Sequence, residues 1–168
     1  MDPVEITAGR LHLRPWAPWD APALQSLLDD PEVAHWTPHP YPCPPGYAAD
    51  RIDGDPAAWA TGTRAELAVL DATTAQLLGT AGLYRIQGGQ AEVGWVTGTS
   101  ARGRGVATEA VAAVCRWGFA GLGLERLEAH VLTGNAASVR VAEKVGFTAV
   151  GTDGDVGVYA LTAYGQVR

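Results

Sequence analysis

The alternation of apolar and polar residues along this chain predicts strands and helices from end to end. Residues 6–16 alternate in the manner of a first strand. Asp20 can cap a following helix, which we expect to end near residues 30–31. Five prolines between residues 33 and 46 fix φ and remove N–H donors, so we expect no regular element there.

The pattern is clearer in the second half. Gly88-Gly89 between two alternating runs is a strong hairpin signal, and Asn135 and Gly146 fit the two ends of a helix. We expect strands at 66–71, 77–86, 91–97, 126–132, 147–151 and 156–164, a helix at 107–119, the helix that Asn135 caps, and one helix or two short ones within 48–59, broken near Gly54. These elements predict an α/β protein with a mixed sheet.

The composition of the chain narrows the classes of protein to which it can belong. With 168 residues, 47% of them hydrophobic and 18% charged, the chain can fill the core of one domain, 1–168. The net charge of -6 argues against a nucleic-acid or acidic-membrane binder and suits an amine-bearing partner. Two cysteines provide neither a disulfide framework nor a metal site. No signal peptide and no apolar stretch of about 20 residues is evident, so we expect a soluble cytoplasmic protein.

The most informative stretch is residues 92–113, in which an apolar strand leads through a glycine-rich basic run into a helix. The first N–H groups of a helix lack partners, and the helix dipole favours negative charge there. Glycines let a phosphate approach the main chain, and arginines add charge-assisted hydrogen bonds. The stretch therefore predicts an anion site, unless it is only a tight strand-to-helix connection with solvated arginines.

The element order and three motifs resemble the GNAT acyltransferases, within them the RimJ/RimL ribosomal-protein acetyltransferase group. The motifs are the loop Arg102-Gly103-Arg104-Gly105-Val106-Ala107, the strand Ala91-Glu92-Val93-Gly94-Trp95, and the segment from Asn135 to Ser138 with Glu143-Lys144-Val145-Gly146-Phe147 after it. The resemblance covers nearly the whole chain. It implies the acyl-CoA N-acyltransferase fold, with a mostly antiparallel central sheet flanked by helices.

The same resemblance implies how acetyl-CoA, the acyl donor, is held. Backbone amides of the loop would bind the pyrophosphate, and the coenzyme arm would pass Asn135 and pair with strand residues like an added strand. The Val96 N–H would polarise the thioester carbonyl. The implied coenzyme residues are Trp95, Val96, Thr97, Arg102, Gly103, Arg104, Gly105, Val106, Ala107, Thr108, Asn135 and Ser138.

Glu92 is the candidate general base. It shares a strand face with Gly94, which leaves room for a substrate beside the carboxylate. Related transferases place a base at the equivalent strand position. The alternative is a glutamate that is merely ion-paired to a neighbouring arginine. Glu66, at a strand start, is a second candidate base.

The last helix departs from the commoner GNAT pattern. Ala142 stands where many members have a tyrosine that protonates the departing thiolate. Ser138 lies four residues earlier on the same face and is the candidate acid or hydrogen-bond donor. Alternatively, Ser138 and Asn135 only form a helix cap.

The loop at residues 33–46 is expected to form one wall of the acceptor site, with Trp36 and Tyr41 as flat contact surfaces. His35 and His39 would pair on a metal only within a helix, which the prolines oppose, so we expect no metal. Cys115 is expected to pack in a helix, and His130 to be structural.

The resulting hypothesis is an N-acetyltransferase that moves an acetyl group from acetyl-CoA directly to a primary amine in a ternary complex. The acceptor would be a protein N-terminus or a small molecule. The alternative is a non-catalytic sensor that binds acyl-CoA without turnover. The sequence is compatible with a homodimer but does not fix the oligomeric state.

Overall fold

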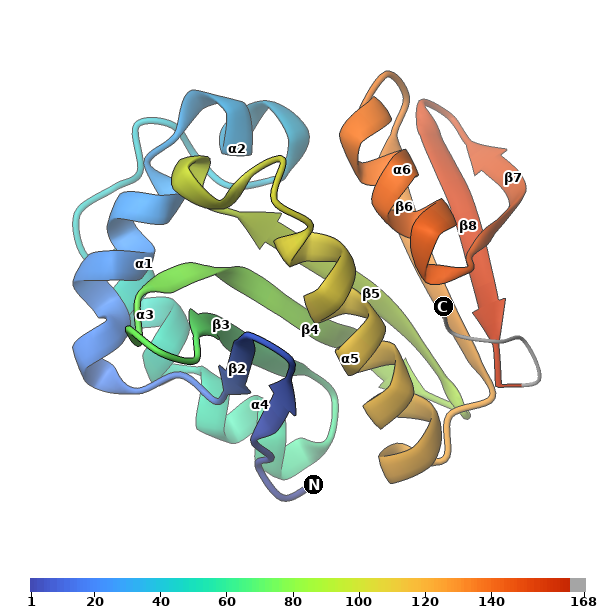
Figure 1. Cartoon of the computed structure of the whole chain (residues 1–168), viewed down its shortest axis with the longest axis horizontal. Helices are drawn as coiled ribbons and strands as arrows, with labels where there is room; N and C mark the ends of the chain where they lie inside the picture. Colours follow the sequence, from blue (N-terminus) through green and yellow to red (C-terminus); the bar gives the residue numbers. More distant parts are fainter. Residues whose placement is uncertain (164–168) are drawn as a thin grey trace.

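The computed structural model describes residues 1–163, in which eight strands form one open sheet in the order β1-β2-β3-β4-β5-β6-β8-β7 (Figure 1). Only the β5–β6 pair is parallel among these strands, so the mixed, mostly antiparallel sheet is confirmed. The elements are β1 (Ile6–Ala8), β2 (Leu11–Arg14), α1 (Ala21–Leu28), α2 (Pro31–Trp36), α3 (Tyr47–Asp53), α4 (Asp55–Thr61), β3 (Ala65–Asp71), β4 (Leu77–Gln87), β5 (Gln90–Thr97), α5 (Val106–Leu122), β6 (Arg126–Leu132), α6 (Ala136–Val145), β7 (Thr148–Asp153) and β8 (Val156–Thr162).

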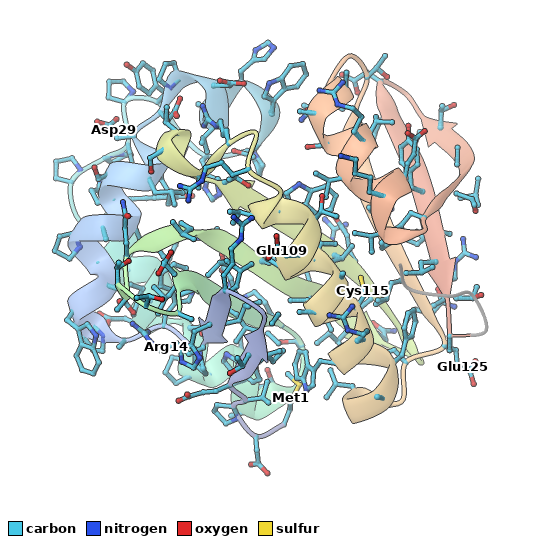
Figure 2. The ribbon with its side chains drawn as sticks, in the orientation of Figure 1. Met1, Arg14, Asp29, Glu109, Cys115 and Glu125 are labelled. Carbon is cyan, nitrogen blue, oxygen red and sulfur yellow. The ribbon has the colours of Figure 1, made fainter. Side chains whose placement is uncertain are left out.

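Helices cover both faces of the sheet. Figure 1 shows α5 lying across β4 and β5 on the near side, with α6 beside it. The alternation of β3, β4 and β5 turns Leu67, Leu83 and Val93 toward α5, where they join the main core. Cys115 of α5, labelled in Figure 2, is fully buried in that core, and burial raises the pKa of its thiol to about 12. Cys115 is therefore a packing residue, as the sequence predicts.

The opposite face carries α1, α3 and a smaller core. Leu24 and Leu28 of α1 pack there with Ile52 of α3, and Val96 of β5 contacts this cluster. Among residues 1–163, no helix is long and apolar enough to cross a membrane.

Two predictions near the N-terminus are wrong in detail. The expected strand 6–16 is a hairpin of β1 and β2, because Gly9 adopts a φ of 57° and turns the chain. The proline-rich segment 33–46 begins inside a helix, α2, whose N-cap Asp30 accepts a hydrogen bond from the Glu32 N–H at 2.8 Å. Proline disrupts a helix interior but is well placed at Pro31, the first helical position.

The later elements agree closely with the sequence prediction. The β4–β5 hairpin turns at Gly88-Gly89, Asn135 caps α6, and Gly146 ends it with a φ of 114°. The 48–59 segment is two short helices, α3 and α4, separated at Gly54. The last strand was expected to reach Tyr164, which lies outside the described residues; β8 ends at Thr162.

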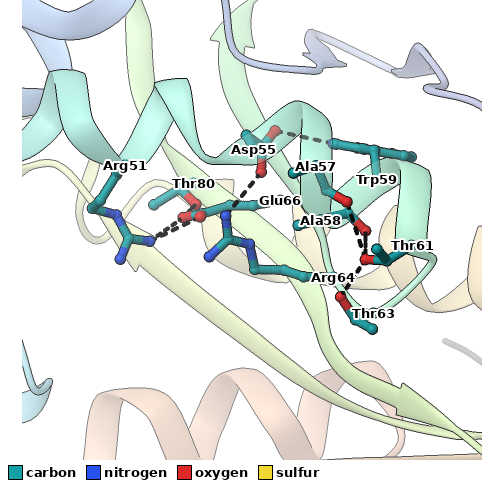
Figure 3. Close-up of polar contacts among 10 residues, drawn as sticks. All are labelled: Arg51, Asp55, Ala57, Ala58, Trp59, Thr61, Thr63, Arg64, Glu66 and Thr80. Atoms are coloured by element: carbon teal, nitrogen blue, oxygen red, sulfur yellow. Dashed lines mark hydrogen bonds and ion pairs between the residues drawn. The ribbon is translucent and has the colours of Figure 1, made fainter.

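A buried polar cluster joins α3 and α4 to β3 and β4 (Figure 3). The Glu66 carboxylate accepts two hydrogen bonds from Arg51 Nη2, at 2.8 and 3.0 Å, and one from Thr80 at 2.9 Å. These partners offset the cost of burying Glu66.

The cost of burying the Asp55 carboxylate is offset less completely than that of Glu66. Trp59 Nε1 donates to it at 3.0 Å, but Arg64 Nη2 lies 3.4 Å away. Burial and the negative charge of Glu66 raise the pKa of Asp55 from 3.8 to about 6, against the opposing effect of Arg64.

This shift predicts a stability change with pH. Between pH 3.8 and about 6 the folded state binds the Asp55 proton more tightly than the unfolded chain does, so this contribution to stability is lost as pH rises through that window. We expect the free energy of unfolding of Asp55→Asn, taken relative to that of the wild type, to be about 2 kcal/mol higher at pH 7.5 than at pH 4.5. Urea unfolding of both proteins at the two pH values measures the difference, and an equal difference at both would contradict it.

Candidate active site

A cleft of about 570 Å³ opens where β5 and β6 separate. The two strands pair only through Gln90–Glu92 and Arg126–Glu128, and Figure 1 shows them diverging toward α2 and α6. Most residues that the sequence singled out line this cleft: Trp36, Glu92, Trp95, Val96, Thr97, Arg102, Gly103, Gly105, Val106, Ala107, Thr108, Asn135 and Ser138.

Two of the predicted residues lie elsewhere. Tyr41 is 55% exposed and is not among the described residues that line the cleft, so its expected contact with the acceptor has no support. The Arg104 side chain also lies outside this lining and donates to the Ser100 carbonyl at 3.3 Å.

Along β5, the backbone groups of the odd-numbered residues point away from β4 and toward the cleft. Gly98 N–H donates to Leu78 O on the β4 side at 2.8 Å, and the β4–β5 register is unbroken along this stretch. Because N–H groups alternate in direction along a strand, Val96 N–H also points to β4, whereas Trp95 N–H points toward the cleft. The Val96 amide is therefore not available to polarise a carbonyl in the cleft, and this expectation is corrected; the amides that point to the cleft are those of Val93, Trp95 and Thr97.

At the start of α5 the glycine loop leaves backbone donors free to bind an anion. Gly105 is the N-cap, with a φ of 80°, and Gly103 has a φ of 70°. Glu109 is the first residue whose N–H pairs within the helix, with Gly105 O at 3.0 Å, which leaves the three preceding amides without helical partners. A Cβ built on Gly103 meets nothing within 4 Å, so this side of the loop is open.

A carboxylate in the first turn of α5 would oppose anion binding, but it is neutralised. Arg10 Nη2 lies 2.8 Å from Glu109 Oε1 and also donates to the Arg104 carbonyl. Glu109 is labelled in Figure 2. The helix N-terminus therefore keeps its positive potential.

Arg102 is occupied by protein partners. It pairs with Asp30 at 2.8 Å and Glu32 at 2.9 Å, and its Nε donates to Thr97 O at 3.1 Å. Thr99 Oγ1 adds a hydrogen bond to Asp30 at 2.8 Å. This side chain fixes the loop against α2, whereas the sequence suggested a phosphate ligand.

Asp30 remains ionised in this arrangement. Burial alone would raise its pKa, but the hydrogen bonds from Thr99 and the Glu32 N–H and the nearby Arg102 hold the pKa below its ordinary value. The Asp30–Arg102 contact is thus a stable ion pair between the start of α2 and the loop.

Glu92 lies at the point where β5 and β6 part. It is paired in register with Glu128 of β6 and with Tyr84 of β4. Arg85 Nη1 lies 2.6 Å from its carboxylate, and His130 Nδ1 lies 3.9 Å from it. Its side chain is 27% exposed and borders the cleft, so both the catalytic and the ion-pair interpretations keep a geometric basis.

Glu66 is a poorer candidate base. Its carboxylate is 6% exposed, is held by Arg51 and Thr80, and is not among the described lining residues. Burial and the Glu66 charge raise the pKa of Tyr84, which lines the cleft, well above its ordinary value, so Tyr84 stays protonated.

On α6, the cap and the cleft share residues. The Asn135 side chain accepts a hydrogen bond from Ser138 N–H at 3.1 Å, as the capping alternative predicted. This bond uses the Ser138 backbone and leaves its hydroxyl available. Ala142 is fully buried in the core, so position 142 supplies no acid to the cleft.

The sequence reasoning missed His130. Its side chain borders the cleft and contacts Glu128 at 3.1 Å, a position that the sequence did not indicate. The available signal was the Glu128-x-His130 spacing, which places both residues on one strand face. Among residues 1–163 no group of three or more His, Cys, Asp or Glu is arranged to hold a metal ion.

Two relatives show sequence similarity over different lengths. Uncharacterized N-acetyltransferase p20 of Bacillus licheniformis is 30% identical over 140 residues, which cover 82% of this chain and 79% of that protein. Probable N-acetyltransferase YjcK of Bacillus subtilis (strain 168) is 37% identical over 82 residues, 47% of this chain. The match with YjcK spans 45% of that protein, less than half its length.

Solved structures share the fold. RimJ of Mycobacterium smegmatis, in complex with a CoA-disulfide, has a TM-score of 0.78 and 24% identity, with 96% of this chain and 86% of that one covered. RimL, a ribosomal L7/L12 alpha-N-protein acetyltransferase in complex with coenzyme A, has a TM-score of 0.84 and 19% identity, with 95% of this chain and 98% of that one covered. Spermidine N-acetyltransferase of Vibrio cholerae, in complex with CoA and spermine, has a TM-score of 0.78 and 19% identity, with 92% of this chain and 96% of that one covered.

The family model for the acetyltransferase (GNAT) domain matches residues 10–148. This match covers the loop, β5 and the whole of α6. The chain belongs to the GNAT family of acyl-CoA-dependent N-acetyltransferases.

Proposed function

We propose that residues 1–168 form one acetyltransferase domain that moves an acetyl group from acetyl-CoA directly to a primary amine, with both substrates bound together. The observation that carries the proposal is the continuity of the cleft. The open edge of β5 begins at Glu92, passes Trp95, and leads to the glycine loop at the start of α5. One extended molecule bearing phosphates at one end and a thioester at the other fits this arrangement.

The residues present suit the coenzyme. The amides of Val106, Ala107 and Thr108 supply donors for the pyrophosphate, and the open side of Gly103 lets it approach. The free β5 edge supplies main-chain partners for the amide groups of the pantetheine arm.

We assign the reaction to the place where β5 and β6 separate. Glu92 accepts a proton from the ammonium group, and the neutral amine attacks the thioester carbon. The Trp95 N–H stabilises the negative charge that develops on the carbonyl oxygen. As the carbon–sulfur bond breaks, the electron pair leaves with sulfur, and the Ser138 hydroxyl donates a hydrogen bond to the thiolate.

The acceptor side of the cleft is walled by Trp36, Pro38 and His39. Trp36 offers a flat apolar surface beside a mostly open groove. RimL and the spermidine enzyme, which share this fold, exemplify a protein N-terminus and a small polyamine as acceptors. We include both classes in the proposal, and place the reaction in the cytoplasm.

Thiol release from acetyl-CoA, measured against a panel of short peptides and small amines, tests the proposal. We expect release that depends on one acceptor class, together with an acetylated product detected by mass spectrometry. Micromolar acetyl-CoA binding without release for any acceptor would contradict it and favour the acyl-CoA sensor.

Gly105→Val is expected to weaken acetyl-CoA binding at least about tenfold, a loss of about 1.4 kcal/mol. A β-branched residue is strained at the φ of 80° found here, so the loop must shift at the helix N-terminus. Isothermal titration calorimetry with acetyl-CoA measures the change.

Gly123→Val is the matched control for that variant. Gly123 caps the other end of α5 with a φ of 66°, and a Cβ there meets nothing within 4 Å. We expect a similar loss of stability with unchanged acetyl-CoA affinity, and equal weakening by both variants would assign the effect to general destabilisation.

Glu92→Gln is expected to lower kcat about 100-fold, since it removes the proton acceptor, while acetyl-CoA affinity changes little. Arg85→Gln is the control, because it breaks the 2.6 Å ion pair but keeps the Glu92 carboxylate. Steady-state rates with the best acceptor of the panel distinguish the two interpretations. If both variants lose the same activity, Glu92 serves as an ion-pair partner and not as the base.

A further inference from the structure

The geometry points to His130 as a second proton acceptor in the reaction, with Glu128 as its positioning residue. This inference rests on the proposed acetyl transfer and adds a catalytic group to it. The pairing of β5 with β6 ends at Glu92 and Glu128. His130 lies two residues further along β6, on the same strand face, and is thus the first β6 side chain of that face beyond the pairing.

The hydrogen bond to Glu128 determines which imidazole nitrogen is free. His130 Nε2 lies 3.1 Å from Glu128 Oε2. Hydrogen bonds from His130 and Arg126 hold the pKa of Glu128 below its ordinary value, so its carboxylate only accepts. Nε2 must therefore carry the hydrogen of the neutral ring, and the lone pair lies on Nδ1.

Nδ1 and the Glu92 carboxylate form a pair of acceptors. Nδ1 lies 3.9 Å from Glu92 Oε2, a separation at which one amine nitrogen can donate to both atoms. Both groups border the cleft. The attacking amine therefore has a site with two hydrogen-bond acceptors on one side and the open β5 edge on the other.

Acetyl transfer to an ammonium group removes two protons from its nitrogen, and two acceptors beside the amine can take one each. The ammonium loses one proton to Glu92, which frees the lone pair that forms the carbon–nitrogen bond. The nitrogen is then again positively charged, and its second proton passes to His130 Nδ1 as the carbon–sulfur bond breaks and the electron pair leaves with sulfur. The thiolate and solvent take up the two protons, which restores both acceptors.

The charges around the imidazole come from several elements. Glu92 faces it from β5 and is itself paired with Arg85 of β4, and Arg126 binds Glu128 on β6. On the α6 side the cleft is lined by Arg140 and Lys144. The neighbour on β8 is the apolar Val158.

The chain contains a matched control in His12. Its Nε2 contacts Glu5 at 3.2 Å, and its side chain is 32% exposed, against 33% for His130. His12 lies on β2 and is not among the described residues that line the cleft. Substitution by Gln keeps an N–H donor for the carboxylate in both cases but removes the base.

The test compares His130→Gln and His12→Gln with the wild type at pH 8, using saturating acetyl-CoA and the best acceptor of the panel. We expect the wild-type to His130→Gln ratio of kcat/KM to be about 100 at pH 8, because the glutamine side chain cannot accept the second proton. The ratio for His12→Gln should stay near one, and acetyl-CoA affinity should be unchanged in both variants. A ratio below about three for His130→Gln at pH 8 would overturn the assignment.

A second measurement does not depend on turnover. Long-range ¹H–¹⁵N spectra of the imidazole at pH 8 should show the Nε2–H tautomer at His130, and Glu128→Gln should mix the two tautomers and lower kcat/KM less than His130→Gln does. An Nδ1–H tautomer in the wild type would rule His130 out, even if His130→Gln failed to fold. Absence of acetylated product from every acceptor would refute the proposed function, while the spectrum would still decide whether His130 presents a base to the cleft.

Discussion

The parallel pairing of β5 with β6 lasts for only three residues on each strand, and the rest of the site depends on where it stops. Beyond Glu92, the β5 groups that face away from β4 pair with no strand among residues 1–163. Unpaired main-chain groups must find water or a ligand, so this edge is suited to an extended molecule that forms strand-like hydrogen bonds. The same separation of strands exposes the side chains of Glu92 and His130 to that molecule.

The ion pairs of Arg102 connect the two sides of the cleft. Through Asp30 and Glu32, the loop at the start of α5 is attached to α2, the helix that carries Trp36 of the proposed acceptor wall. The Arg102 guanidinium is therefore used to hold the loop in place. In the proposed site, anion binding is left to the amides and dipole of α5, whose own acidic residue, Glu109, is neutralised by Arg10. The coenzyme side and the acceptor side thus share one fixed frame.

Local pattern and turn chemistry were enough to predict most of the sheet and the helices α5 and α6. They failed where a residue's role depends on position within an element. Pro31 begins a helix, and Gly9 divides an apparent strand. At the site, the sequence identified the loop and Glu92 as lining residues. The direction of the Val96 N–H and the partners of Arg102 depend on strand register and on a segment some 70 residues away, which no local pattern contains.

His130 illustrates the same limit most clearly. Its spacing from Glu128 puts the two side chains on one face of β6, which the sequence alone could show. Its closeness to Glu92 requires the parallel register that aligns Glu92 with Glu128. A slip of one residue would turn the whole β6 face to the other side of the sheet, taking Glu128 and His130 away from Glu92 together. The proposed chemistry therefore depends on the three residue pairs that align β5 with β6, which form the shortest strand pairing in the centre of the sheet.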